Sequence, residues 1–176
     1  MGGTVIGANL FLEGCTRKAT GSVESLFEPD TVDLLGNIAD TILPPTGSPG
    51  AKEAGVGSFI PVMVRDCYTP EDQQVFLDGL RQLDKASNDQ FGRKFQELTA
   101  DERTELLIAA DKEAKAYQAK KTENDPNHYF HLVKQLTLLG YFTSELGATK
   151  ALRYVQVPGR YDGDFPYKKG DKAWAI

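Results

Sequence analysis

The chain has few of the residues on which several classes of protein depend. It contains two cysteines, two histidines and one tryptophan among 176 residues. Because Cys15 and Cys67 lie far apart in different settings, we do not expect a disulfide framework. No apolar run approaches the roughly 20 residues that a membrane-spanning helix needs. With 40% hydrophobic and 26% charged residues, the composition is that of one ordinary globular core.

An excess of basic residues is also missing. The formal net charge is -5, and the lysines and arginines are dispersed among acidic residues. A protein that binds nucleic acid through its phosphates needs a cationic surface to do so. We therefore expect no nucleic acid partner.

Motifs for nucleotide or nucleophile chemistry are absent from the sequence. Neither GxGxxG nor GxxxxGK[ST] occurs, and there is no GxSxG. The DGD at Asp162–Asp164 resembles the start of a calcium loop, but Phe165, Pro166 and Tyr167 follow where ligands would be needed, so we read it as a turn. We predict no catalytic residue, no bound cofactor and no metal site, and hence no enzymatic activity of this chain alone.

The two histidines leave one alternative open. His128 and His131 stand three residues apart, and with Asp125 they could face a common metal ion, since residues at this spacing share a helix face. A stand-alone helical metalloprotein would need a third ligand. The other interpretation is a polar helix start without metal.

Residues 1–29 are predicted to be a leader and tether. The stretch GGTVIGANLFLEGC is a short apolar run that ends in a leucine, a small residue and Cys15, as in a bacterial lipoprotein signal, although Glu13 and the lack of a positive n-region depart from that pattern. We infer that the native chain starts upstream of Met1 and that Cys15 is lipidated. The alternative is a disordered leader with an incidental cysteine.

Residues 30–152 are predicted to form an all-α, irregular bundle of about five helices. Apolar residues recur at helical spacing in five segments, which are 30–43, 58–68, 69–87, 99–121 and 125–142. Thr69 followed by Pro70 and the pair Thr99 and Glu102 are helix starts with clear capping signals. For the others we expect caps at Asp30 and Ser58 and a start at Asp125-Pro126.

Two of these helices carry further predictions. In the second, Cys67 falls on the apolar stripe, which predicts an inert thiol in the core. The fifth helix is apolar on more than one face, so it is either central to the bundle or covered by a second surface. We interpret it as central.

Residues 153–176 are predicted to be an extended tail that binds a partner protein. The tail has five aromatic residues interleaved with Arg153 and Arg160, and prolines keep it from forming a helix. Tyr, Trp and Arg are the side chains that most often anchor interfaces. The alternative is that the tail folds back over its own helices.

The strings GYFTSELGATKALRYVQVPGRYDGDFPY and ADTILPPTGSPGAKEAGVGSFI resemble the small subunit, called subunit 3 or gamma, of the gluconate 2-dehydrogenase family. The resemblance covers roughly 34–167. It implies a helical, non-catalytic subunit that accompanies a large FAD-dependent flavoprotein of the glucose-methanol-choline type, which oxidises a sugar, sugar acid or alcohol. A cytochrome c subunit with haem c is a possible third member.

The resemblance also implies a cellular setting and a set of contact residues. The subunit would aid twin-arginine export of its partner to the periplasm, where Cys15 would tether the complex to a membrane through a lipid. Gly147 and Gly159 are expected to hold the shape of the tail. The predicted partner-binding residues are Tyr141, Glu145, Arg153, Tyr154, Arg160, Tyr161, Asp162, Phe165 and Tyr167. An envelope lipoprotein that binds an unrelated partner remains an alternative.

Overall fold

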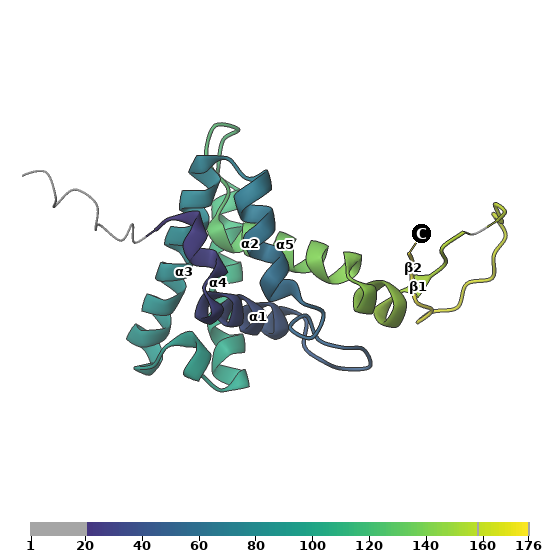
Figure 1. Cartoon of the computed structure of the whole chain (residues 1–176), viewed down its shortest axis with the longest axis horizontal. Helices are drawn as coiled ribbons and strands as arrows, with labels where there is room; N and C mark the ends of the chain where they lie inside the picture. Colours follow the sequence, from purple (N-terminus) through teal and green to yellow (C-terminus); the bar gives the residue numbers. More distant parts are fainter. Residues whose placement is uncertain (1–20, 158, 176) are drawn as a thin grey trace, which may run out of the picture.

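The computed structural model describes residues 21–157 and 159–175. Within that range the chain is mostly helical, with one short pair of strands (Figure 1). The helices, in chain order, are η1 Val23–Phe27, α1 Pro29–Ile42, α2 Val56–Cys67, α3 Pro70–Phe91, η2 Phe95–Glu97, α4 Ala100–Gln118, α5 Tyr129–Thr143 and η3 Gly147–Ala151. The strands are β1 Arg153–Tyr154 and β2 Trp174–Ala175. The predicted all-α class is confirmed.

The helix starts follow the predicted capping signals in two cases. The Thr69 side chain accepts a hydrogen bond from the Asp72 N–H at the start of α3. Thr99 and Glu102 form the reciprocal capping box at the start of α4. Both caps satisfy backbone donors that the first helical turn leaves without partners.

Three other predicted starts are wrong by two or three residues. Helix α1 is capped by Glu28, with Pro29 in its first turn, rather than by Asp30. Helix α2 begins after Gly55, which adopts a left-handed conformation (φ 78°), rather than at Ser58. Helix α5 is capped by His128 rather than by Asp125. The backbone conformations of a proline and a glycine set where α1 and α2 begin. The start of α5 was missed because histidine is an uncommon N-cap.

Helices α1 and α2 pack against each other at an unusually short distance. A Cβ atom on Gly57 of α2 would lie 2.6 Å from the Val32 carbonyl oxygen and 2.9 Å from the Gly36 nitrogen, both on α1. Only glycine allows the two backbones to approach this closely. The contact fixes how the first two helices cross.

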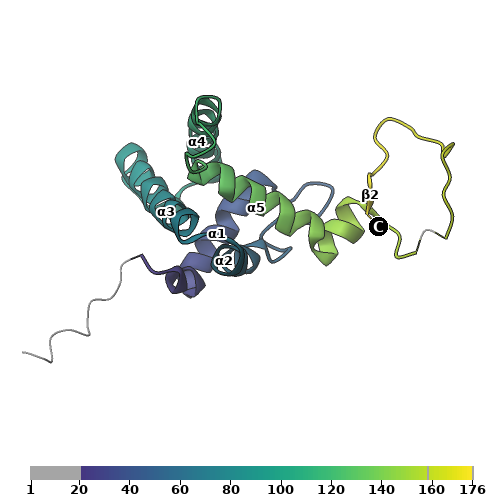
Figure 2. The same cartoon turned by 90° about the horizontal axis from the view of Figure 1, so that it is seen from above.

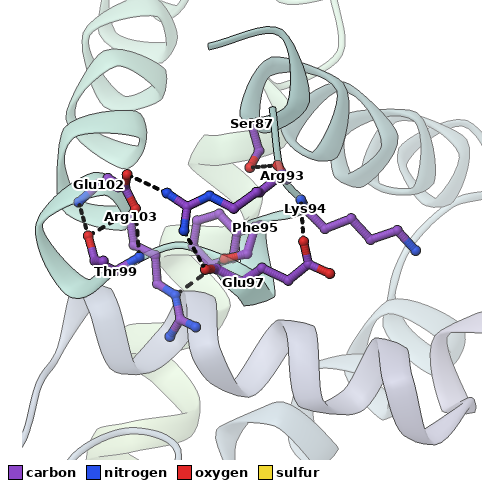
Figure 3. Close-up of polar contacts among 8 residues, drawn as sticks. All are labelled: Ser87, Arg93, Lys94, Phe95, Glu97, Thr99, Glu102 and Arg103. Atoms are coloured by element: carbon purple, nitrogen blue, oxygen red, sulfur yellow. Dashed lines mark hydrogen bonds and ion pairs between the residues drawn. The ribbon is translucent and has the colours of Figure 1, made fainter. Parts of the chain in front are cut away.

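The connection between α3 and α4 is held by a network of polar contacts around a buried ring (Figure 3). The fully buried Ser87 donates a hydrogen bond to the Arg93 carbonyl at 2.7 Å. Arg93 pairs with Glu102 at 2.6 Å, and the Arg103 guanidinium lies 5.6 Å from the centroid of the fully buried Phe95 ring. The turn is therefore bonded to both helices that it joins.

One continuous core runs through the bundle, with side chains from η1, α1–α5 and the connecting segments. Leu26 of η1 is completely buried, so the packed part of the chain starts upstream of the predicted boundary at residue 30. None of the helices in the described part of the chain combines the length and apolarity that a bilayer crossing requires.

The prediction of a buried thiol at position 67 is wrong. Cys67 is the last residue of α2 and is exposed. Ile60 and Val64 of the same helix are completely buried. The apolar stripe of α2 therefore reaches the core only as far as Val64, because the last turn of the helix extends past the edge of the core.

Candidate partner-binding arm

Exposed apolar side chains gather in the last part of the chain. Among the described residues, thirteen large hydrophobic side chains are exposed, and nine of them follow residue 137. These nine are Leu138, Leu139, Phe142, Tyr154, Val157, Tyr161, Phe165, Tyr167 and Trp174. We call residues 138–175 the arm and residues 21–137 the bundle. A clustering of this kind is typical of an interaction surface.

Helix α5 belongs to both parts. Its first half is central, as predicted: Phe130, Val133 and Leu136 are at most 3% exposed and pack among the other helices. Its second half extends beyond those helices, and Figures 1 and 2 show this from two directions. Leu139 and Phe142 are therefore 45% and 39% exposed. The two interpretations of an all-round apolar helix, central or covered by a second surface, apply to different halves of the same helix.

Tyr141 lies in the protein's own core. It is 4% exposed, and its hydroxyl donates a hydrogen bond to the Pro49 carbonyl at 2.7 Å and lies 3.1 Å from the Ser48 hydroxyl. Tyr141 thus anchors the proline- and glycine-rich segment between α1 and α2 onto α5. Among the predicted contact residues, it is the one whose side chain is not on the surface.

The chain bends between α5 and η3, at Ser144. The Ser144 hydroxyl donates to the Tyr141 carbonyl at 2.7 Å and accepts from the Gly147 N–H at 2.9 Å. A Cβ atom on Gly147 would collide with the Tyr141 carbonyl oxygen. Serine and glycine at these positions therefore fix the direction in which the arm leaves the helix, with Glu145 exposed just after the bend.

Beyond the bend the tail closes into a loop. Strands β1 and β2 pair in parallel, with Arg153 opposite Trp174 and Tyr154 opposite Ala175. The Arg153 N–H donates to the Ala173 carbonyl at 2.8 Å, and the Val155 N–H donates to the Ala175 carbonyl at 3.0 Å. We call residues 155–173 the C-terminal loop; Figure 2 shows it at the far end of the arm.

Arg153 closes the base of this loop with two aromatic rings. Its guanidinium carbon lies 4.5 Å from the Trp174 ring centroid and 5.5 Å from that of Phe165. The two rings meet edge to face, with centroids 5.1 Å apart. We call these three residues the clasp. Cation–π contacts of this kind contribute about 0.5–1 kcal/mol each at exposed sites. The guanidinium predicted to contact a partner is thus engaged within the chain.

The remaining predicted contact residues are exposed on or beside the loop. Tyr161 is 96% exposed, Tyr167 76% and Tyr154 50%. Arg160 pairs with Asp162 at 3.2 Å, and Asp162 also accepts a hydrogen bond from the Asp164 N–H. The loop therefore presents two tyrosine rings to solvent with an ordered turn between them.

The two histidines have separate surroundings. The His128 Nδ1 accepts a hydrogen bond from the Phe130 N–H at 3.2 Å, and its ring makes tilted contacts with the rings of Tyr117 and Tyr129. His131 instead lines a groove of about 400 Å³ between α4 and α5. Within residues 21–157 and 159–175, no three histidine, cysteine, aspartate or glutamate side chains gather in the way that a metal ion would require.

Other ionisable groups of the bundle are explained by burial and by salt bridges. Lys115 and Lys134 both lie within 2.7 Å of Asp111 and hold the pKa of its carboxyl below the usual range. Burial raises the pKa of Tyr129 to about 12. Cys15, the predicted lipidation site, lies outside the described residues.

The comparison with known families agrees with this architecture. The family model described as gluconate 2-dehydrogenase subunit 3 matches residues 29–159, most of the chain. The chain belongs to the gluconate 2-dehydrogenase subunit 3 family. The family match begins with α1 and ends just after β1, so it includes the bundle and Arg153 but stops short of the predicted limit at residue 167. No curated protein and no solved structure matches the chain.

Membership of the gluconate 2-dehydrogenase subunit 3 family implies a subunit within a dehydrogenase complex. The contact segment in the tail stays a prediction. The exposed apolar surface on the second half of α5 was not predicted, because its leucines were assigned to the core. The signal was present in the sequence as a helix with too many apolar faces for one core.

Proposed function

We propose that this chain is a non-catalytic small subunit that binds and stabilises the catalytic subunit of a dehydrogenase complex through its arm. The observation that carries the proposal is the division of apolar surface. The bundle completes a core of its own, yet nine large hydrophobic side chains of the arm remain exposed. When a partner covers such a surface, the free energy falls by about 25 cal/mol per Å² of apolar area buried.

The partner in this proposal is a large FAD-dependent flavoprotein of the glucose-methanol-choline type. FAD belongs to that subunit, and haem c belongs to a possible cytochrome c subunit. The family description, which names a subunit of gluconate 2-dehydrogenase, supports a sugar, sugar acid or alcohol as the oxidised substrate. In this arrangement specificity resides in the flavoprotein's pocket.

The proposal places the complex in the periplasm. The small subunit would accompany its folded partner through twin-arginine export, and a lipid on Cys15 would hold the complex at a membrane. What supports this is the apolar, small-residue stretch that precedes Cys15. A Cys15→Ser variant should release the complex into the soluble periplasmic fraction, and it should leave the dehydrogenase activity intact.

Co-expression with the proposed flavoprotein subunit tests the partnership. The arm variant Leu139→Asp should lower recovery of the flavoprotein at least tenfold, because it places a charge in the apolar contact. The matched control Ile108→Asp alters a side chain on α4 that is 64% exposed and should leave recovery unchanged. Equal recovery with both variants, or no co-purification with the wild-type chain, would contradict the proposal.

A further inference from the structure

Charge is divided unevenly along the chain. Residues 1–152 contain 15 basic and 22 acidic residues, a net charge of -7. Residues 153–176 contain five basic and three acidic residues, a net charge of +2. The sequence as a whole is acidic, so this basic end is hidden in the total.

Of the three acidic side chains of the C-terminal loop, two have contacts within the loop and the third is that of Asp164. Asp162 pairs with Arg160, and Asp171 accepts a hydrogen bond from the Lys168 N–H at 2.8 Å. Lys168 and Lys169 are exposed, and no carboxylate in the described ranges lies within ion-pair distance of either ammonium group. The loop therefore presents two adjacent cations next to the exposed ring of Tyr167.

The clasp fixes these groups in place before any partner arrives. Arg153, Phe165 and Trp174 close the loop at its base, and the paired strands β1 and β2 set its register. A preformed loop loses less conformational entropy on binding than a disordered tail does. Its charges then meet the partner in a defined geometry.

We propose that the C-terminal loop docks on an acidic surface of the flavoprotein subunit, where carboxylates face Lys168 and Lys169 and an apolar recess receives Tyr167. This inference rests on the proposed function, since it names the chemistry of the surface that the arm recognises. Complementary charges of this kind chiefly speed association and select the correct partner. The exposed leucines of α5 then supply apolar contact area.

Two other occupants fit the loop less well. Anionic membranes bind clusters of about four to eight basic residues, whereas this loop offers two unpaired lysines beside each other. A second copy of this chain would bring its acidic bundle to the loop, but such head-to-tail contacts generate open filaments unless the rotation closes a ring. A folded acidic protein surface is therefore the occupant that the loop favours.

The test compares two charge reversals of equal size. Lys168→Glu with Lys169→Glu changes the loop, and Lys112→Glu with Lys120→Glu changes exposed lysines of the bundle by the same net charge. Association of each purified variant with the purified flavoprotein is measured at about 0.05 M and about 0.5 M salt. We expect the loop variant to associate at least tenfold more slowly than the wild type at low salt, and the control to lie within about twofold of the wild type. The difference should shrink at high salt, because exposed charges are then screened.

Equal slowing in both variants, or none in either, would overturn the inference while leaving the partnership intact. Failure of the wild-type chain to bind the flavoprotein would overturn the partnership and the inference together. If the wild-type chain binds vesicles containing phosphatidylglycerol and the loop variant does not, the lysines bind lipid instead. Salt-sensitive self-association in light scattering, also lost in the loop variant, would assign them to a second copy.

Discussion

The bundle and the arm are built by opposite rules. In the bundle, aromatic side chains such as Phe76 and Phe95 are completely buried and determine stability. In the arm, the rings of Tyr161 and Tyr167 are mostly in solvent, and order comes from one pair of strands, a clasp and a serine-glycine bend. The same residue types therefore have different consequences according to their region, which predicts that mutations in the two parts separate stability from binding.

The largest effect on stability is expected in the core. Replacing Phe76 by Ala removes a ring that is completely buried, and it should lower the free energy of unfolding by about 3–5 kcal/mol. Tyr161→Ala removes a ring that is 96% exposed and should change it by less than about 0.5 kcal/mol. Urea denaturation followed by circular dichroism measures both values. Similar losses in the two variants would mean that the arm is part of the cooperative unit.

High pH should weaken the bundle through one buried phenol. Burial raises the pKa of Tyr129 to about 12, so the folded state favours the neutral form. This contribution is complete below pH 10, the pKa of an unfolded tyrosine, and is lost as the pH rises toward 12; the loss is about 2 kcal/mol at pH 12. The Tyr129→Phe variant should lose less stability over the same interval. Parallel pH profiles of the two proteins would contradict the assignment.

The joint between the two regions can be tested at Gly147. A methyl group there collides with the Tyr141 carbonyl oxygen, so Gly147→Ala should destabilise the joint by about 1–3 kcal/mol and redirect the arm. Gly47→Ala is the matched control, because no atom lies within 4 Å of its added methyl group and its φ is not positive. Small-angle X-ray scattering reports the change of shape. A scattering profile unchanged in the Gly147→Ala variant would show that the bend does not direct the arm.

The smallest effect concerns the order of the loop. Arg153→Ala removes both cation–π contacts, worth about 1–2 kcal/mol together, and should speed chymotryptic cleavage in residues 155–173 by about fivefold to thirtyfold. Arg160→Ala removes only an exposed pair with Asp162 and should leave the cleavage rate within about twofold. The melting temperature of the bundle should stay constant in both variants. Equal cleavage rates in the Arg153→Ala variant and the wild type would show that the clasp does not order the loop.

Local signals in the sequence predicted much of the bundle and part of the arm. Thr69 and the Thr99–Glu102 pair are local caps, so their helices start where the sequence indicates. Cys67 was misplaced because periodicity shows which residues share a stripe but not where the core beneath that stripe ends.

The exposed aromatic residues of the tail were also predicted, but their closure into a loop was not. Pairing of Arg153 with Trp174 joins residues 21 positions apart in sequence, and no local pattern encodes that contact. Arg153 has an obvious chemistry in the sequence, yet only the fold shows whether its planar group faces outward or lies against the chain's own rings.

Because of the parallel strand pair at its base, the C-terminal loop can change in length without losing the contacts that hold its two ends together. Its register depends only on the two short strands, so residues near Tyr161 could be inserted, removed or exchanged without shifting the residues that hold the ends together. One scaffold can in this way carry loop tips of different length and sequence, while the helical body that supports them stays the same.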